Sequence, residues 1–192
     1  MQSDTRRLVQ RFMRLWRFRG RDRRYRALPF VAPPAARLPA THGLAAGGLV
    51  DRVALNSATY NKLVARSDLE KIHPDLKRFY VRFQSELQKR GIPFYVHSAY
   101  RSDAEQTSLF KRGVTKARAG QSGHNHGMAF DFVHWSRHWD LTRLEWAVIG
   151  AIGKEIARKM NLKVTWGGDW KRFYDPAHWE LFNWGDLVRN GG

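Results

Sequence analysis

Residues 122–132 read Ser-Gly-His-Asn-His-Gly-Met-Ala-Phe-Asp-Phe, and two potential metal ligands in this stretch, His124 and Asp131, lie seven positions apart around Gly127. Beyond the glycine, Met128–Val133 alternates its side chains between two faces, a pattern that predicts a β-strand. A helix fits badly, because seven helical residues rise about 10 Å and would hold the two ligands apart. A loop at His124 that leads into a strand at Asp131 can bring both side chains to one point.

A third ligand is expected near the C-terminus. Imidazole nitrogen and carboxylate oxygen form a ligand mix that suits zinc, and a two-ligand site is incomplete. The strongest candidate is His178, which begins the short hydrophobic run 178–182. Asp175 lies three residues before it, across a turn that contains proline, so its carboxylate can act beside the metal without binding it. Three ligands, an open fourth position and an adjacent carboxylate base are the parts of a hydrolytic zinc site.

Three separated motifs in this chain resemble one known family. The pattern Ser122-x-His124-x-x-Gly127-x-Ala129-x-Asp131 resembles the signature of the D-Ala-D-Ala metallopeptidase family. That family includes D,D-carboxypeptidases, D-Ala-D-Ala dipeptidases and phage L-alanyl-D-glutamate endopeptidases. Ser98-Ala-Tyr-Arg-Ser102 is similar to the upstream motif of the family. Trp166-Gly-Gly-Asp-Trp170 with Asp175-Pro-Ala-His178 looks most like the phage endopeptidase branch.

The resemblance covers roughly residues 55–184 and implies a role for each matching residue. It implies a zinc ion held by three ligands, a carboxylate general base and an arginine that contacts the substrate carbonyl. In this chain the ligands are His124, Asp131 and His178, the base is Asp175, and the arginine is Arg101. Substrate contacts are expected from Ser122, Gln106, Trp166 and Trp170, although large aromatic side chains are more often part of a core.

The function implied by the resemblance is zinc-dependent cleavage of the peptidoglycan stem peptide. The segment 166–178 favours an L-alanyl-D-glutamate endopeptidase of endolysin type, acting at the cell wall or in the periplasm. A D,D-carboxypeptidase is the alternative, because the ligands are common to both activities. A zinc-containing binding module without catalysis is a third interpretation, since hedgehog signalling domains have a related fold. The presence of Asp175 and Arg101 favours catalysis over that module.

The pattern of elements predicts an α+β fold with a small antiparallel or mixed sheet flanked by helices, as in hedgehog domains and D-Ala-D-Ala peptidases. Helices are expected over 74–90, 103–111 and 141–160, and strands over 92–98, 128–133, 162–166 and 178–182. The first helix should direct Leu76, Phe79, Tyr80, Phe83 and Leu87 inward. The last should bury Leu144, Val148, Ile152 and Ile156, which are spaced by four.

The composition allows one ordinary domain with an appendage. The chain has 192 residues, 43% of them hydrophobic, no cysteine, and no hydrophobic run long enough for a transmembrane helix. Its net charge of +17 favours polyanionic partners, such as anionic lipid, lipopolysaccharide, the acidic cell wall or nucleic acid. Charge alone does not choose among them.

The appendage is predicted at the N-terminus. Residues 1–26 hold ten arginines and a hydrophobic stripe that includes Leu8, Phe12 and Trp16, a pattern typical of a cationic amphipathic helix that binds anionic membranes or lipopolysaccharide. Arginines interrupt every possible signal-peptide core. A helix docked on the catalytic domain, a transit peptide and a nucleic-acid arm are the other interpretations. Residues 27–50, rich in Pro, Gly and Ala, are expected to be a linker to the peptidase domain, residues 51–192.

Other histidines offer weaker alternatives. His124-Asn125-His126 spells the name of a nuclease motif, but in those nucleases the named residues are not consecutive. His126 could replace His124 as a ligand, although the family spacing favours His124. His134 and His138 are expected to be surface or supporting residues, and His42, His73 and His97 structural ones. Glu180 should share the strand face of His178, where it could orient that ligand or be solvated.

Overall fold

The computed structural model describes residues 40–67 and 69–190. The predicted arm at 1–26 and most of the predicted linker lie outside these residues. Where the linker enters the described part, the structure differs from the prediction, because helix α2 runs over Ala40–Gly48 and packs against α7. Alanine favours a helix even among glycines, and the following Leu49 is fully buried. The folded part therefore includes residues that we assigned to the linker.

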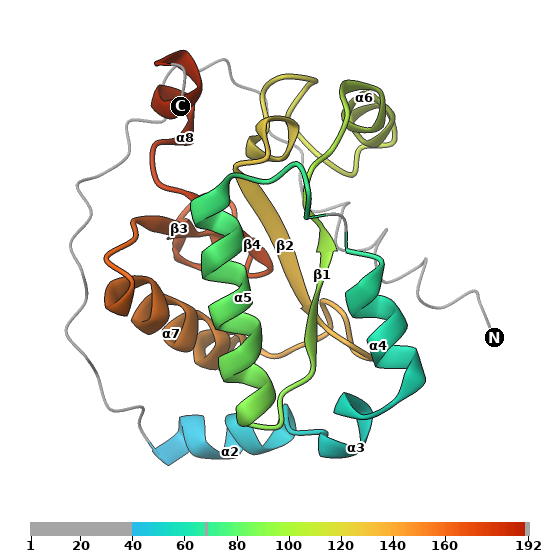
Figure 1. Cartoon of the computed structure of the whole chain (residues 1–192), viewed down its shortest axis with the longest axis vertical. Helices are drawn as coiled ribbons and strands as arrows, with labels where there is room; N and C mark the ends of the chain where they lie inside the picture. Colours follow the sequence, from blue (N-terminus) through green and yellow to red (C-terminus); the bar gives the residue numbers. More distant parts are fainter. Residues whose placement is uncertain (1–39, 68, 191–192) are drawn as a thin grey trace.

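Four strands form one antiparallel sheet in the order β1-β2-β4-β3 (Figure 1). This confirms the α+β prediction and resolves the sheet type. The strands are β1 (Phe94–Ser98), β2 (Ala129–His134), β3 (Val164–Trp166) and β4 (His178–Leu181). Each lies within or beside a predicted strand.

Further helical segments surround the sheet. The α-helices are α3 (Arg52–Leu55), α4 (Ala58–Ala65), α5 (Pro74–Lys89), α6 (Asp103–Lys111), α7 (Arg143–Lys159) and α8 (Trp184–Arg189). Two 3₁₀ turns, η1 (Gly123–His126) and η2 (Gly167–Asp169), sit beside β2 and β4. Helix α6 begins at a capping box formed by Ser102 and Glu105, and α7 at one formed by Thr142 and Glu145.

Helices α5 and α7 cover one face of the sheet, where the core lies (Figure 1). The five residues that we expected α5 to bury are all buried. Phe83 contacts the rings of Phe132 and Trp179, both with centroids 5.1 Å away. On α7 the prediction for Leu144 is wrong, because its side chain is 48% exposed. The other three predicted positions of α7 are buried.

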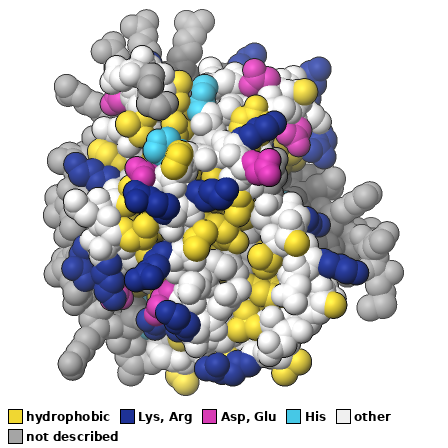
Figure 2. All heavy atoms as spheres, in the orientation of Figure 1, with side chains coloured by type: hydrophobic (Ala, Val, Ile, Leu, Met, Phe, Trp, Pro, Cys, Tyr) yellow, Lys and Arg dark blue, Asp and Glu magenta, His cyan; other side chains and the backbone are white. Residues whose placement is uncertain are grey.

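The charge of the chain is visible on this helical face. Figure 2 shows Lys and Arg side chains spread over it, interleaved with hydrophobic ones and with few acidic groups. Independently of this view, some basic side chains of the helices are paired along their own helix, as in Arg90–Glu86 and Lys159–Glu155. Exposed pairs of this kind contribute little to stability.

Two glycines let α7 approach the sheet closely. A Cβ at Gly150 would overlap the ring of Trp166, and a Cβ at Gly153 would overlap the ring of Trp179 and lie 2.8 Å from Phe83. The tryptophan rings are stacked, with centroids 5.9 Å apart. The absent side chains thus make room for the aromatic layer that supports β3 and β4.

We predict that Gly153→Ala destabilises the protein. The added methyl overpacks the Trp179 ring, which should lower the free energy of unfolding by about 1–3 kcal/mol. The measurement is denaturant or thermal unfolding of the full chain. Gly43→Ala is the matched control, because a Cβ added at Gly43 would meet no atom within 4 Å. That change should be neutral or stabilise α2 by up to about 1 kcal/mol. Equal effects of the two substitutions would contradict the packing explanation.

Candidate metal centre

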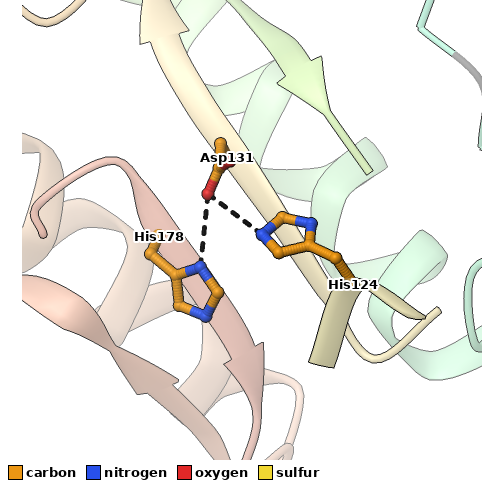
Figure 3. A group of neighbouring side chains, drawn as sticks. All are labelled: His124, Asp131 and His178. Atoms are coloured by element: carbon orange, nitrogen blue, oxygen red, sulfur yellow. Dashed lines mark hydrogen bonds and ion pairs between the residues drawn. The ribbon is translucent and has the colours of Figure 1, made fainter. Parts of the chain in front are cut away.

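Three buried side chains from separate segments meet at one point (Figure 3). Asp131 on β2 lies directly opposite His178 on β4, and η1 directs His124 toward the same carboxylate. Asp131 Oδ1 is 3.3 Å from His124 Nε2 and 3.2 Å from His178 Nδ1. One potential ligand atom from each residue lies within 4.8 Å of the others. The structure therefore brings the three predicted ligands together.

The outer nitrogen of each histidine has its own partner. His124 Nδ1 is 2.6 Å from the carbonyl oxygen of Ala99, and His178 Nε2 is 3.1 Å from Glu180 Oε2. A carbonyl or carboxylate at the outer nitrogen holds a proton there and directs the lone pair of the inner nitrogen toward the centre. Two inner lone pairs that face one carboxylate oxygen require a cation or protons between them. The donor set therefore fits a zinc ion.

The turn before β2 explains how His124 reaches the site. Gly127 has φ +66°, and a Cβ there would overlap the carbonyl oxygen of Lys71, so only glycine is compatible with this turn. Ser122 Oγ accepts a hydrogen bond of 3.3 Å from the backbone N–H of His124. Ser122 thus caps η1. The substrate contact that we expected for Ser122 stays a prediction.

Arg101 lies on the other side of the same carboxylate. Its Nη2 donates to Asp131 Oδ2, and its Nε donates to Ser98 Oγ at 2.8 Å. Its backbone is tied to η1, since the Arg101 N–H donates to the His124 carbonyl at 3.0 Å. The guanidinium is thereby held beside Asp131. Its contact with the substrate carbonyl stays a prediction.

Asp175 is half-buried beside the cluster. Two backbone hydrogen bonds of 3.1 Å hold it in place. Its N–H donates to the carbonyl of Gly167, and its carbonyl accepts from the N–H of His178. Burial, and secondly the charge of Asp131, raise the pKa of Asp175 to about 6. A carboxyl group that titrates near neutrality can both accept and return a proton.

The charges of the cluster shift each other's pKa. Burial lowers the pKa of His124, and the opposing effect of Asp131 does not cancel it. Burial also disfavours charged His178, but hydrogen bonds to Asp131 and Glu180 raise its pKa to about 10. Although burial alone would raise the pKa of Asp131, the charges of His124 and Arg101 hold it well below its usual range. The carboxylate is therefore ionised and attracts cations.

The structure buries two of the side chains that we expected to contact substrate. Gln106 is fully buried and donates to the carbonyl of Ala117 at 2.8 Å, so it braces the loop 114–121 from inside. Trp166 is 6% exposed, donates its Nε1–H to the carbonyl of Pro176 at 2.8 Å, and belongs to the core. Trp170 is partly exposed, with its ring centroid 5.1 Å from that of His178. A substrate contact by Trp170 stays a prediction.

The alternative histidines lie elsewhere. His126 Nε2 is 3.0 Å from the carbonyl of Gly120, and its ring stacks on Trp184. His134 Nδ1 accepts from the backbone N–H groups of Ser136 and Arg137, at 3.4 and 3.3 Å. His134 therefore caps a turn. Among the described residues, only the three predicted ligands form a group of His, Asp or Glu that could hold a metal ion.

Comparison with known proteins agrees with this geometry. A family model described as D-alanyl-D-alanine carboxypeptidase matches residues 115–181. Peptidoglycan L-alanyl-D-glutamate endopeptidase CwlK of Bacillus subtilis (strain 168) is 32% identical over 128 residues, which cover 57% of this chain and 73% of CwlK. This chain belongs to the D-Ala-D-Ala metallopeptidase family. The crystal structure of the L-Ala D-Glu endopeptidase ChiX from Serratia marcescens matches with a TM-score of 0.51 and 30% identity. That match covers 67% of this chain and 92% of ChiX.

The sequence left two interpretations open for Glu180, which could orient His178 or be solvated. The structure places its carboxylate on the outer nitrogen of His178. We predict that Glu180→Gln weakens Zn²⁺ affinity by about 10–100-fold, because a neutral amide fixes the ring tautomer less well than a carboxylate. Competition with a chelator of known affinity measures the change. Glu155→Gln on the surface of α7 is the control, and unchanged affinity in Glu180→Gln would contradict the orienting role.

Proposed function

We propose that this chain is a zinc-dependent L-alanyl-D-glutamate endopeptidase of peptidoglycan. The observation that carries the proposal is the buried cluster of His124, Asp131 and His178, with Asp175 and Arg101 beside it. CwlK and ChiX, which share about a third of their residues with this chain where they match, carry that activity in their names. Membership of the family supports the class of reaction, and the activity named for these two relatives supports the choice of the bond that is cleaved.

Zinc held by His124, Asp131 and His178 would supply a Lewis acid that lowers the pKa of the attacking water to about 7. Asp175 accepts the proton of the attacking water and returns it to the amine that leaves. Arg101 donates N–H groups to the oxygen of the carbonyl under attack, where negative charge develops. Ser98 holds that guanidinium through its 2.8 Å hydrogen bond, so the donor is oriented before substrate binds.

The second candidate function is D,D-carboxypeptidase activity, which the description of the matching family model favours. Mass spectrometry of digested muropeptides separates the two. The endopeptidase releases the stem after L-Ala, whereas the carboxypeptidase removes one terminal D-Ala. Products of the second type alone would overturn the proposed bond and leave the metallopeptidase chemistry intact.

We predict that Asp175→Asn abolishes turnover without removing the metal. The amide cannot accept a proton, so kcat should fall by about 10²–10⁴-fold. Zinc content should stay near one ion per chain because Asp175 is not a ligand. Muropeptide hydrolysis and metal analysis measure the two quantities, and Asp169→Asn, an exposed carboxylate that pairs with Lys154, is the matched control. Full activity of Asp175→Asn would exclude it as the base.

We also predict an acidic limb in the pH profile of kcat/KM. The base must be ionised, so activity is lost as pH falls through the pKa of Asp175. A cation bound at the cluster offsets the charge of Asp131, but it does not remove the effect of burial on Asp175. The midpoint of the limb should therefore lie between the ordinary pKa of an aspartate, 3.8, and about 6. Zinc content measured at each pH separates this loss from acid release of the metal. A limb that follows metal content would contradict the assignment.

The proposed site of action is the cell wall or periplasm, in an endolysin-type role. None of the described helices has the length and apolar character needed to cross a bilayer. We propose that the arginine-rich residues 1–26 bind an anionic envelope surface, since each engaged basic residue contributes about 1 kcal/mol. Deletion of residues 1–39 should then reduce binding to anionic vesicles while activity on soluble wall fragments survives. Unchanged vesicle binding would remove the arm from this role.

A further inference from the structure

Strand β1 contains a bulge next to the metal centre. Val96 pairs with Phe132 and Ser98 pairs with Asp131, so His97 is one residue more than β2 can match. A bulge of this kind bends the strand and re-aims side chains, and bulges are frequent beside active sites. The extra residue lies next to the serine that holds the catalytic arginine.

His97 lies on the face of the sheet that carries Asp131. Its ring centroid is 6.3 Å from that of Tyr95, which pairs with Val133 and therefore points away from α5 and α7, as Asp131 does. The side chain of His97 is exposed. Desolvation by its neighbours lowers the pKa of His97. The charge of Asp131 opposes this shift, and the charge of Arg101 adds to it. The imidazole is thus a neutral polar group on the rim of the site.

Trp139 rests on this histidine. The two rings meet edge to face with centroids 4.7 Å apart, and Trp139 also stacks on His138 at 6.4 Å. Although the indole is packed against both histidines, it is 46% exposed. We refer to His97, His138 and Trp139 as the Trp139 platform. A large aromatic surface that is fixed and still open to solvent is suited to bind a ligand with little loss of entropy.

The turn that carries the platform is well anchored. His138 adopts a left-handed backbone with φ 52°, which a residue other than glycine accepts only where its surroundings hold it. Its N–H donates to the carbonyl of His134 at 2.9 Å, and its Nδ1 is 3.2 Å from the hydroxyl of Tyr95. The N–H of Leu141 closes the turn on the carbonyl of Trp139 at 2.9 Å. The position of the indole is therefore set before substrate binds.

We infer that the Trp139 platform binds the muramic acid sugar that carries the stem peptide. The inference rests on the proposed function, in which the bond cleaved follows L-Ala. The amine of that L-Ala is joined to the sugar through a short acyl group, so the sugar begins about two residue lengths, roughly 7 Å, from the bond. The C–H face of a sugar ring packs on an indole, while its hydroxyl and acetamido groups suit neutral imidazoles.

The strand order gives the substrate a direction. The platform lies on the β1 side of Asp131, whereas Trp170 lies beside His178 on the β4 side. A stem that crosses the centre with its sugar over β1 directs D-Glu and the following residues toward β4. A carboxypeptidase works at the far end of the stem and has no sugar near its scissile bond. The platform therefore has a use in the endopeptidase that it lacks in the alternative.

The test compares two soluble substrates with the full zinc-loaded chain. One is a disaccharide muropeptide, and the other is the same stem peptide after enzymatic removal of its sugars. Wild-type kcat/KM should be higher for the muropeptide. Trp139→Ala should lower it by about tenfold for the muropeptide, mainly through KM, and leave the free stem within about twofold. Trp139→Phe should keep most of the preference, which separates loss of the platform from misfolding.

Leu144→Ala is the matched control, because this side chain is 48% exposed and belongs to α7, the helix that packs on the other face of the sheet. Equal losses for both substrates in Trp139→Ala, or no preference of the wild type for the muropeptide, would overturn the inference. Product masses report the bond in every reaction. If wild type releases only terminal D-Ala, the proposed function fails, and this outcome is distinct from cleavage after L-Ala without any preference for the sugar.

Discussion

The site depends on one buried carboxylate that several segments share. Asp131 Oδ1 faces His124 and His178, and Oδ2 accepts from Arg101. An ionised carboxylate in a protein interior is costly unless its charge is compensated, so each of these partners stabilises the position of the others. Because the partners come from the β1–α6 loop, η1 and β4, the cluster forms only when β1, β2 and β4 have come together.

The register of β2 connects this cluster to the core. Phe130 and Phe132 face α5, and the ring centroids of Phe132 and Phe83 are 5.1 Å apart. Asp131 between them faces the other side of the sheet. A slip of one residue would exchange the two faces, burying the carboxylate under the helices and exposing the phenylalanines. The aromatic packing that stabilises the sheet therefore also positions the metal ligand. Gly153 contributes to the packing and, through it, to the position of the ligand, because it lets α7 pack closely against Trp179.

Local signals predicted the site, and distant contacts explain where prediction failed. The strand alternation after Gly127 and the position of Asp175 before His178 are short-range patterns, and the structure reproduces both. Leu144 was misassigned because residues spaced by four turn by about 40° at each step and leave the buried face of a helix. Contacts between distant segments account for what local patterns miss. Gln106 and Trp166 are buried by the loop 114–121 and by α7, which no local pattern reveals, and α2 forms where it can pack on α7.

The residues around the metal centre, and not the three metal ligands, must determine which bond is cleaved. The same three ligands with an adjacent carboxylate serve a carboxypeptidase and an endopeptidase equally well, because both hydrolyse an amide. What differs is the group on each side of that amide, and in our proposal each group meets a separate segment. The turn 135–141 carries Trp139 on the β1 side, and the segment after η2 carries Trp170 on the β4 side. The loop 114–121, braced by Gln106, follows α6 and leads into η1. These segments can change in sequence without disturbing Asp131, so one metal centre can serve several positions along the same stem.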